Sequence, residues 1–178
     1  VKGHHFPNVT LVGVIAADSS LYLEDYRASE RTFQLLTQVA GRAGREKSKG
    51  NVIIQTYNPD NFCIECSKEQ DYEKFYNAEI MLRKQLKYPP FCDIIVIGIS
   101  GTNENEVKNI SNFIYNNISK QYKNNFSIYK PMPAPIDRIK NKFRWRIIMK
   151  CKLDNNIIDV VNYSLKDIKS SKVRISID

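Results

Sequence analysis

Residues 9–15 read Val9-Thr10-Leu11-Val12-Gly13-Val14-Ile15, a continuous apolar and β-branched run. Such a run is typical of a strand that is buried on both faces of a parallel sheet. Residues 52–55, Val-Ile-Ile-Gln, predict a second strand of the same kind. Between them, apolar residues recur at helical spacing after Ser29, which can cap a helix. The order strand, helix, strand predicts an α/β fold with a βαβ crossover for the first part of the chain.

The end of this predicted helix carries the segment Gln38-Val39-Ala40-Gly41-Arg42-Ala43-Gly44-Arg45. Arg42 and Arg45 are three residues apart, which places both on one helical face, and the two glycines permit close backbone approach. A guanidinium group keeps its charge and matches phosphate oxygens, so the pair is suited to contact a phosphoryl group. A helix that merely ends in glycine, with cations that complement its dipole, is the alternative for this pattern alone.

Several further segments surround this one. They are Lys2-Gly3-His4-His5-Phe6-Pro7-Asn8-Val9, Tyr26-Arg27-Ala28-Ser29-Glu30-Arg31-Thr32-Phe33-Gln34, Tyr88-Pro89-Pro90-Phe91 and Phe143-Arg144-Trp145-Arg146. The first two, together with the arginine segment, resemble motifs V and VI of superfamily 2 helicases, and the last two resemble the C-terminal end of one family among them. The narrower resemblance is to the PriA family of replication-restart DNA helicases, also called primosomal protein N′, and it covers nearly the whole chain.

The resemblance implies the C-terminal part of an ATP-dependent 3′-to-5′ DNA helicase that recognises stalled or branched forks and directs primosome assembly. Arg42 and Arg45 would then be catalytic residues of ATP hydrolysis, and Gln38 and Gly3 would contact the nucleotide. No G-x-x-x-x-G-K-[ST] loop and no evident acidic Walker-B-type strand end occur in the chain. We therefore expect a fragment that is inactive alone, with ATP and Mg²⁺ held mainly by an upstream lobe.

Lys2, His4 and His5 precede the first predicted strand. The resemblance implies that this segment couples the nucleotide state to the DNA strand, so we expect the three residues to lie near DNA or at a lobe interface. Simple packing remains the alternative for the histidines. Asp18 and Ser19 follow the same strand, at the edge where open α/β sheets bind ligands, although a turn and cap would also explain them.

The chain has four cysteines, of which Cys63 and Cys66 form a single Cys-x-x-Cys pair. A structural zinc site needs four ligands, so we expect reduced thiols and no metal site in this chain. The resemblance implies that the whole protein holds zinc in a module upstream of residue 1. The longest apolar runs are far shorter than the roughly 20 residues that cross a bilayer, and no leader opens the chain. We therefore expect a cytoplasmic monomer without a membrane partner.

Residues 61–90 predict a helical connector with balanced charge, in which Ser67 and Gln70 have the form of a capping box. Its aromatic stripe, which includes Tyr72, Phe75 and Tyr76, favours a packing role, and a stacking role on DNA is the alternative. From residue 91 onward, the apolar pattern predicts strand, helix, strand, strand, helix, strand. This order is that of a ferredoxin-like α+β sandwich.

The chain is thus predicted to comprise the end of helicase lobe 2 of a RecA-like fold (1–60), a helical connector (61–90) and a basic α+β C-terminal domain (91–178). Residues 91–178 hold fifteen basic and eight acidic side chains, nearly all of the net charge of +8. Between residues 130 and 152, eight basic residues are opposed only by Asp137. Such a cluster predicts an anionic partner, although a solvated basic face is the alternative.

Alternation along a strand at 143–149 places Phe143, Trp145, Ile147 and Met149 on one face, expected to be the core, and Arg144 and Arg146 on the other. Three prolines, at positions 131, 133 and 135, are expected to stiffen the preceding loop and present a basic rim. The predicted DNA-binding residues of this domain are Arg138, Lys140, Lys142, Arg144 and Arg146.

Two hypotheses follow for function. In the first, the chain is part of the helicase, with branched DNA, single-stranded DNA-binding protein and other primosome proteins as partners, as the resemblance implies. In the second, it is an isolated binding module without catalytic activity, for branched DNA or for the tail of single-stranded DNA-binding protein. Charge alone does not exclude RNA.

Overall fold

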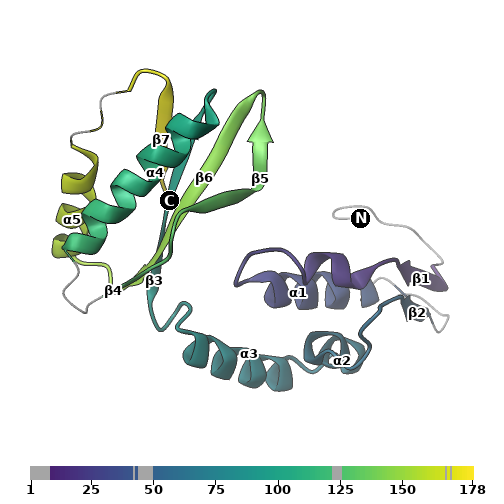
Figure 1. The fold of residues 1–178 in the computed structure, drawn as a ribbon. Coiled ribbons are helices and arrows are strands. Elements are labelled where there is room, and N and C mark those ends of the chain that lie inside the picture. Colours follow the sequence, from purple (N-terminus) through teal and green to yellow (C-terminus); the bar gives the residue numbers. More distant parts are fainter. Residues whose placement is uncertain (1–8, 42, 44–49, 122–125, 167, 169) are drawn as a thin grey trace. The chain divides into compact units, whose positions relative to one another are not determined.

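The computed structural model describes residues 9–41, 43, 50–121, 126–166, 168 and 170–178 (Figure 1). The chain forms two compact units, residues 1–82 and 83–178, each with mixed helix and strand content. The first unit contains β1 (Leu11–Val14), the 3₁₀ helix η1 (Ala17–Ser20), α1 (Ala28–Ala40), β2 (Asn51–Ile54), α2 (Phe62–Glu69) and most of α3 (Tyr72–Leu86). The second contains β3 (Asp93–Gly101), α4 (Glu104–Lys120), β4 (Phe126–Ile128), β5 (Met132–Ile139), β6 (Lys142–Cys151), α5 (Asn155–Leu165) and β7 (Val173–Ile177).

The βαβ prediction is confirmed in its pairing but not in its burial. β1 and β2 pair in parallel, from Leu11 opposite Asn51 to Val14 opposite Ile54, and α1 lies between them in the chain. Within the described residues, however, the side chains of Leu11, Ile15 and Ile53 are 59%, 82% and 60% exposed. In this two-stranded sheet, the face that holds Leu11 and Ile53 has no covering layer in the described part of the chain, whereas Val14 and Ile54 on the other face pack against a small buried cluster.

Helix α1 begins at Ala28, and no side chain caps its first turn, so the prediction of Ser29 as the cap is wrong. Ser29 lies inside the helix. The apolar positions predicted for its buried face hold, since Phe33 and Leu36 are buried. Phe33 stacks on Phe75 of α3 with ring centroids 4.3 Å apart, and these rings form a small core with two buried cysteines.

The connector contains two helices rather than one, and the predicted capping box is wrong. Asn61 caps α2 by accepting a hydrogen bond from the backbone N–H of Cys63, and Asp71 accepts one from the N–H of Lys74 in the first turn of α3. Ser67 lies inside α2, where its hydroxyl donates to the carbonyl of Cys63. Ser67 therefore cannot begin a helix, because Asn61 already offers a cap six residues earlier.

The second unit is built on an antiparallel sheet with strand order β4-β6-β3-β7. Odd-numbered residues of β3 and β6 face one side, where Ile97, Ile99, Ile147 and Met149 are buried at 1% exposure or less. The buried face of α4 and that of α5 belong to the same core cluster, so both helices cover this side of the sheet (Figure 1). The predicted alternation of strands and helices is found here, with one addition.

The addition is β5, which pairs with β6 where an extended proline-stiffened loop was expected. Pro133 and Pro135 lie within the strand. A proline cannot donate a ladder hydrogen bond, so it argues against a central strand, but β5 has β6 as its one partner among the described strands and tolerates it as an edge. Its register is irregular between Pro133 and Arg138.

Among the residues that the structure describes, none of the helices combines the length and apolarity needed to cross a bilayer. The same part of the chain contains no cluster of three or more histidine, cysteine, aspartate or glutamate side chains that could hold a metal ion.

Candidate nucleic-acid interface

Six of the predicted site residues lie outside the described residues. They are the two candidate catalytic arginines and four residues of the N-terminal segment: Arg42, Arg45, Lys2, Gly3, His4 and His5. Their predicted roles therefore stay predictions. Gln38, which precedes the arginines, is exposed in the last turn of α1. Gly41 follows the helix, and its N–H donates to the carbonyl of Thr37.

Asp18 lies where the two parallel strands end, and each oxygen of its carboxylate accepts a hydrogen bond from the protein. One oxygen accepts the Thr56 hydroxyl at 2.7 Å, and the other accepts the backbone N–H of Tyr57 at 2.9 Å. Asp18 thereby ties the segment after β1 to the segment after β2. These two hydrogen bonds lower the pKa of Asp18 below its usual value of 3.8. The turn interpretation of Asp18 is favoured, since its oxygens already have partners.

Asp18→Asn is expected to lower the stability of the first unit at neutral pH and to remove part of its acid sensitivity. A carboxylate whose pKa is lowered on folding adds stability that is present above about pH 4 and is lost as the pH falls through the folded-state pKa. Thermal unfolding of the chain between pH 3 and 7 measures this. The exposed Asp60→Asn is the matched control, and a pH dependence that Asp18→Asn leaves unchanged would contradict the assignment.

The Cys63 and Cys66 pair is buried, at 0% and 1% exposure, and all four cysteines are free thiols. Burial raises the pKa of Cys63 to about 12, and burial also raises the pKa of Cys66. The Cys63 thiol donates to the carbonyl of Ser29, which joins α2 to α1. A cysteine binds a metal ion as the thiolate, and a raised pKa disfavours the thiolate. These two thiols are therefore suited to packing and poorly suited to metal coordination.

The predicted basic rim is the end of the β5–β6 hairpin. The hairpin closes with Ile139 opposite Lys142, and the two residues between them, Lys140 and Asn141, have φ angles of 49° and 58°. Two positive φ angles in a two-residue loop match a type I′ turn, whose twist suits paired strands. Lys140 and Lys142 are therefore held in a tight turn with exposed side chains.

The five predicted DNA-binding residues divide into two groups. Arg138, Lys140 and Lys142 are exposed at the turn, where the Arg138 guanidinium lies 5.0 Å from the Phe143 ring centroid. Phe143 is half-buried and is not part of the core cluster, so its predicted core position is wrong. Its neighbour Arg144 is half-buried and donates to the carbonyl of Ile136 at 3.1 Å, which gives it a structural contact within the hairpin.

Arg144 and Arg146 share the sheet face opposite the helices, as predicted. The strand register adds Arg174 to this face, a residue that sequence reasoning missed. Arg174 of β7 and Arg144 both lie opposite Ser100 of β3, so the three side chains share one face. The signal was present in β7, whose alternation of Val173, Ile175 and Ile177 leaves Arg174 facing outward. The face thus carries cations from two strands as well as the hairpin.

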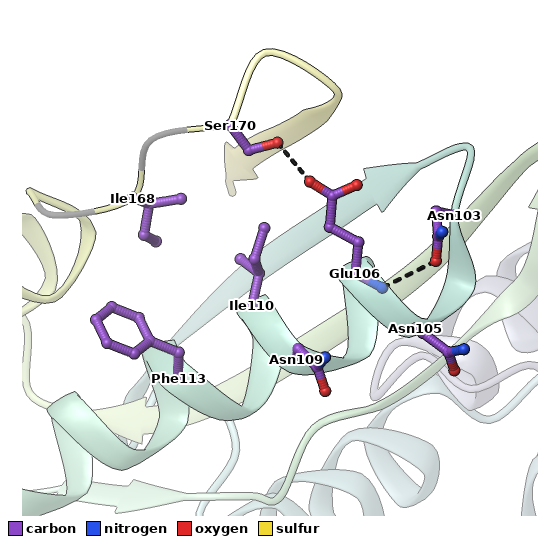
Figure 2. Close-up of a pocket in the computed structure, with 8 residues that line it drawn as sticks. All are labelled: Asn103, Asn105, Glu106, Asn109, Ile110, Phe113, Ile168 and Ser170. Carbon is purple, nitrogen blue, oxygen red and sulfur yellow. Dashed lines mark hydrogen bonds between the residues drawn. The ribbon is translucent and has the colours of Figure 1, made fainter.

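A second feature of this unit differs in chemistry. A cavity of about 480 Å³ lies beside α4. In Figure 2, Glu106, Ile110 and Phe113 project from this helix toward the segment that holds Ile168 and Ser170. The Ser170 hydroxyl donates to the Glu106 carboxylate at 2.8 Å. Amide groups and one carboxylate line it together with apolar side chains, and no lysine or arginine is among its described lining residues. It is therefore unsuited to bind an anion.

The fold and the site together define a class of protein. Its second unit is a basic α+β domain whose cations lie on one hairpin and on one face of the sheet. The unit that precedes it in the chain contains a strand-helix-strand element. The family described as primosomal protein N C-terminal domain matches residues 84–178. The chain belongs to this family, that of the PriA proteins.

Relatives match beyond that domain. Proteins named replication restart protein PriA from Bacillus subtilis, Synechocystis and Rickettsia typhi are 38%, 40% and 40% identical to this chain, and each alignment covers 99% of it. The same alignments cover 22%, 21% and 27% of those relatives. The chain therefore spans only about a quarter of the length of these relatives, and it corresponds to their C-terminal part.

Proposed function

We propose that this chain is the C-terminal part of an ATP-dependent 3′-to-5′ DNA helicase, in which the second unit binds branched DNA at stalled replication forks and supports primosome assembly. The observation that carries the DNA contact is the β5–β6 hairpin, where Arg138, Lys140 and Lys142 are exposed together at one turn. Clustered lysine and arginine side chains bind phosphates and release counterions, which gives affinity without sequence preference.

The two units support this proposal in different ways. In the first, β1 and β2 pair in parallel and leave Leu11, Ile15 and Ile53 exposed. These side chains would be buried if the two strands belonged to the larger parallel sheet of a RecA-like lobe. In the second, the order β4-β6-β3-β7 with α4 and α5 on one side supports a ferredoxin-like sandwich, to which β5 would be an addition.

The catalytic part of the proposal rests on family membership and on the arginine segment. Arg42 and Arg45 would stabilise the charge that develops on the transferred phosphoryl group, with Gln38 and Gly3 near the nucleotide. ATP and Mg²⁺ would be bound mainly by another lobe of the whole protein, and zinc by another module. Lys2, His4 and His5 would lie near the DNA strand. Single-stranded DNA-binding protein and primosome proteins are the proposed protein partners.

The DNA contact is tested by fluorescence anisotropy of the 178-residue chain with a labelled fork, a duplex and a single strand across a salt series. Lys140→Gln/Lys142→Gln is expected to weaken fork binding about tenfold at 0.1 M salt. Loss of two phosphate contacts should also reduce the slope of log K against log salt by about 1.8. Both side chains are exposed at the turn, so folding should be unaffected.

The matched control removes the same charge elsewhere in the unit. Lys120 ends α4 and Lys166 follows α5, and both are exposed on the helical side of the sheet. Lys120→Gln/Lys166→Gln should change fork affinity by less than about twofold, because only general electrostatics is lost. Equal weakening by both double substitutions would show that net charge, rather than the hairpin, is responsible, and would contradict the proposal.

A further inference from the structure

Another cavity of the second unit lies at the C-terminal end of β6, whereas the hairpin lies at the N-terminal end of this strand. This cavity has a volume of about 590 Å³ and is formed by the segment after α3, by β4 and by the end of β6. The residues that matter for its chemistry are Lys87, Phe91, Asp93, Ser127, Lys150 and Lys152. All of them belong to the second unit. Lys150 lies eight positions along β6 from Lys142 at the hairpin, which at about 3.3 Å per residue is roughly 26 Å.

The charge of this cavity is positive. Among its described lining residues, three are lysines and Asp93 is the one carboxylate. Asp93 already accepts the backbone N–H of Leu153 at 2.9 Å, so one of its oxygens is engaged. Three ammonium groups around one concave surface attract an anion, and a phosphodiester can accept from more than one of them.

One of these cations is held in place. The Lys150 ammonium donates to the carbonyl of Leu86 at 2.8 Å and lies 3.6 Å from the centroid of the Tyr88 ring. It is also 5.8 Å from the ring of Tyr129. An ammonium has three donors, so two remain for a ligand after the bond to Leu86. Contact with two rings fixes the position of this charge, which reduces the entropy lost when a ligand binds.

The aromatic side chains beside these cations present flat apolar surface. Phe91 lines the cavity and is 47% exposed, and Tyr129, next to Lys150, is 43% exposed. Exposed rings that neighbour a basic groove are the arrangement on which unpaired bases stack, since every base has a π face. In a duplex the bases are already stacked and paired, so they cannot reach such rings. The volume also suits one nucleotide rather than a helix.

We propose that this cavity binds a nucleotide of single-stranded DNA, with its phosphate at Lys87, Lys150 and Lys152 and its base against Phe91. This inference rests on the proposed function in that it takes DNA as the ligand, but it uses a different set of residues. The hairpin would hold the phosphate backbone of the fork at one end of the sheet, while the cavity takes an unpaired nucleotide at the other.

The test uses the 178-residue chain and three labelled probes: a 12-nucleotide oligothymidylate, an abasic strand of equal length and a 12-base-pair duplex. Lys87→Gln/Lys152→Gln is expected to weaken oligothymidylate binding about tenfold at low salt and to reduce its salt slope by about 1.4. Phe91→Ala should weaken it about fivefold or more, through lost stacking, while leaving abasic-strand affinity unchanged within about twofold. Duplex affinity should change little in both variants.

The hairpin variant Lys140→Gln/Lys142→Gln separates this inference from the proposed function. If only the hairpin substitutions weaken binding, the cavity assignment is overturned and the proposed function stands. If the cavity substitutions weaken single-strand binding and the hairpin substitutions leave fork binding unchanged, the cavity assignment stands and the hairpin contact fails. Equal affinity of the unchanged chain for thymidylate and abasic strands would overturn the base contact. An aspartate-rich peptide that displaces the strand, with thymidylate and abasic affinities equal, would indicate a protein-docking site instead.

Discussion

Ile147→Asp is expected to abolish the cooperative unfolding transition of residues 83–178 at 25 °C. The Ile147 side chain is 0% exposed and belongs to the core that β3, β6, α4 and α5 share. That core cluster consists of hydrophobic side chains, so a carboxylate there would have no charged partner. Desolvation of such an unpaired charge costs several kcal/mol, which is comparable to the about 5–15 kcal/mol that holds a domain together. Urea unfolding followed by circular dichroism measures the effect.

The adjacent residue supplies the control. Ile148 lies one position along β6, half-buried on the opposite face between Arg146 and Lys150 in sequence. Ile148→Asp is expected to change the free energy of unfolding by less than about 1 kcal/mol, since the carboxylate remains solvated near cations. The milder Ile147→Ala should cost about 2–5 kcal/mol. Similar losses from the aspartate substitutions at 147 and 148 would contradict the assigned faces of the strand.

Arg45→Ala is expected to reduce DNA-stimulated ATP hydrolysis about 10³-fold in a complete PriA protein that carries this segment. Arginines that contact the transferred phosphoryl group stabilise its transition-state charge and are worth factors of about 10³–10⁵. Arg42→Ala is expected to act in the same direction. The fold should be unchanged, because the apolar side chains that anchor α1, Phe33 and Leu36, lie on earlier turns. Steady-state phosphate release with and without forked DNA measures the rate.

Arg31 is the matched control for this experiment because it is an arginine of α1, the helix that precedes the arginine segment in the chain. Its guanidinium pairs with Asp25 at 2.8 Å, and its side chain is 52% exposed. An exposed ion pair contributes only about 0–1 kcal/mol, so Arg31→Ala should leave ATP hydrolysis within about twofold of the unchanged protein. Full ATPase activity in both Arg42→Ala and Arg45→Ala would show that these arginines are not the motif VI residues, and the helicase assignment of the segment would fail.

Much of the second unit could be predicted from its sequence because its strands and helices have strong, separate periods. Ile95, Ile97 and Ile99 alternate as a half-buried strand, and the apolar residues of α4 recur at helical spacing. β5 could not be predicted in this way. Two prolines within it argue against a strand, and what compensates them is an edge position beside β6, which depends on tertiary pairing.

Local signals were weaker where several residues could perform the same role. Ser29 and Ser67 both have cap chemistry, yet Asn61 and Asp71 perform that role for α2 and α3, and no side chain caps α1. Which cap forms is decided by where the apolar face of each helix packs, and composition does not reveal that. The cavity cations were equally hidden, because Lys87 and Lys150 are 63 positions apart in sequence and meet only through the sheet.

The structure separates the residues of the predicted basic site by their contacts. Lys140 and Lys142 are exposed at the turn as expected, whereas Arg144 is used in part to hold β5 through the Ile136 carbonyl. A substitution of Arg144 would therefore perturb the hairpin as well as any bound DNA. The sharper probes of binding are the two lysines, whose side chains have no described structural role.

The most direct test of the account is residue-level mapping of the DNA contact on the ¹⁵N-labelled chain, by amide chemical-shift changes during titration with forked DNA. The largest changes are expected in the β5–β6 hairpin, around Lys140 and Lys142, and on the sheet face that carries Arg146 and Arg174. Changes confined to α4 and α5, which cover the other side of the sheet, would contradict this expectation.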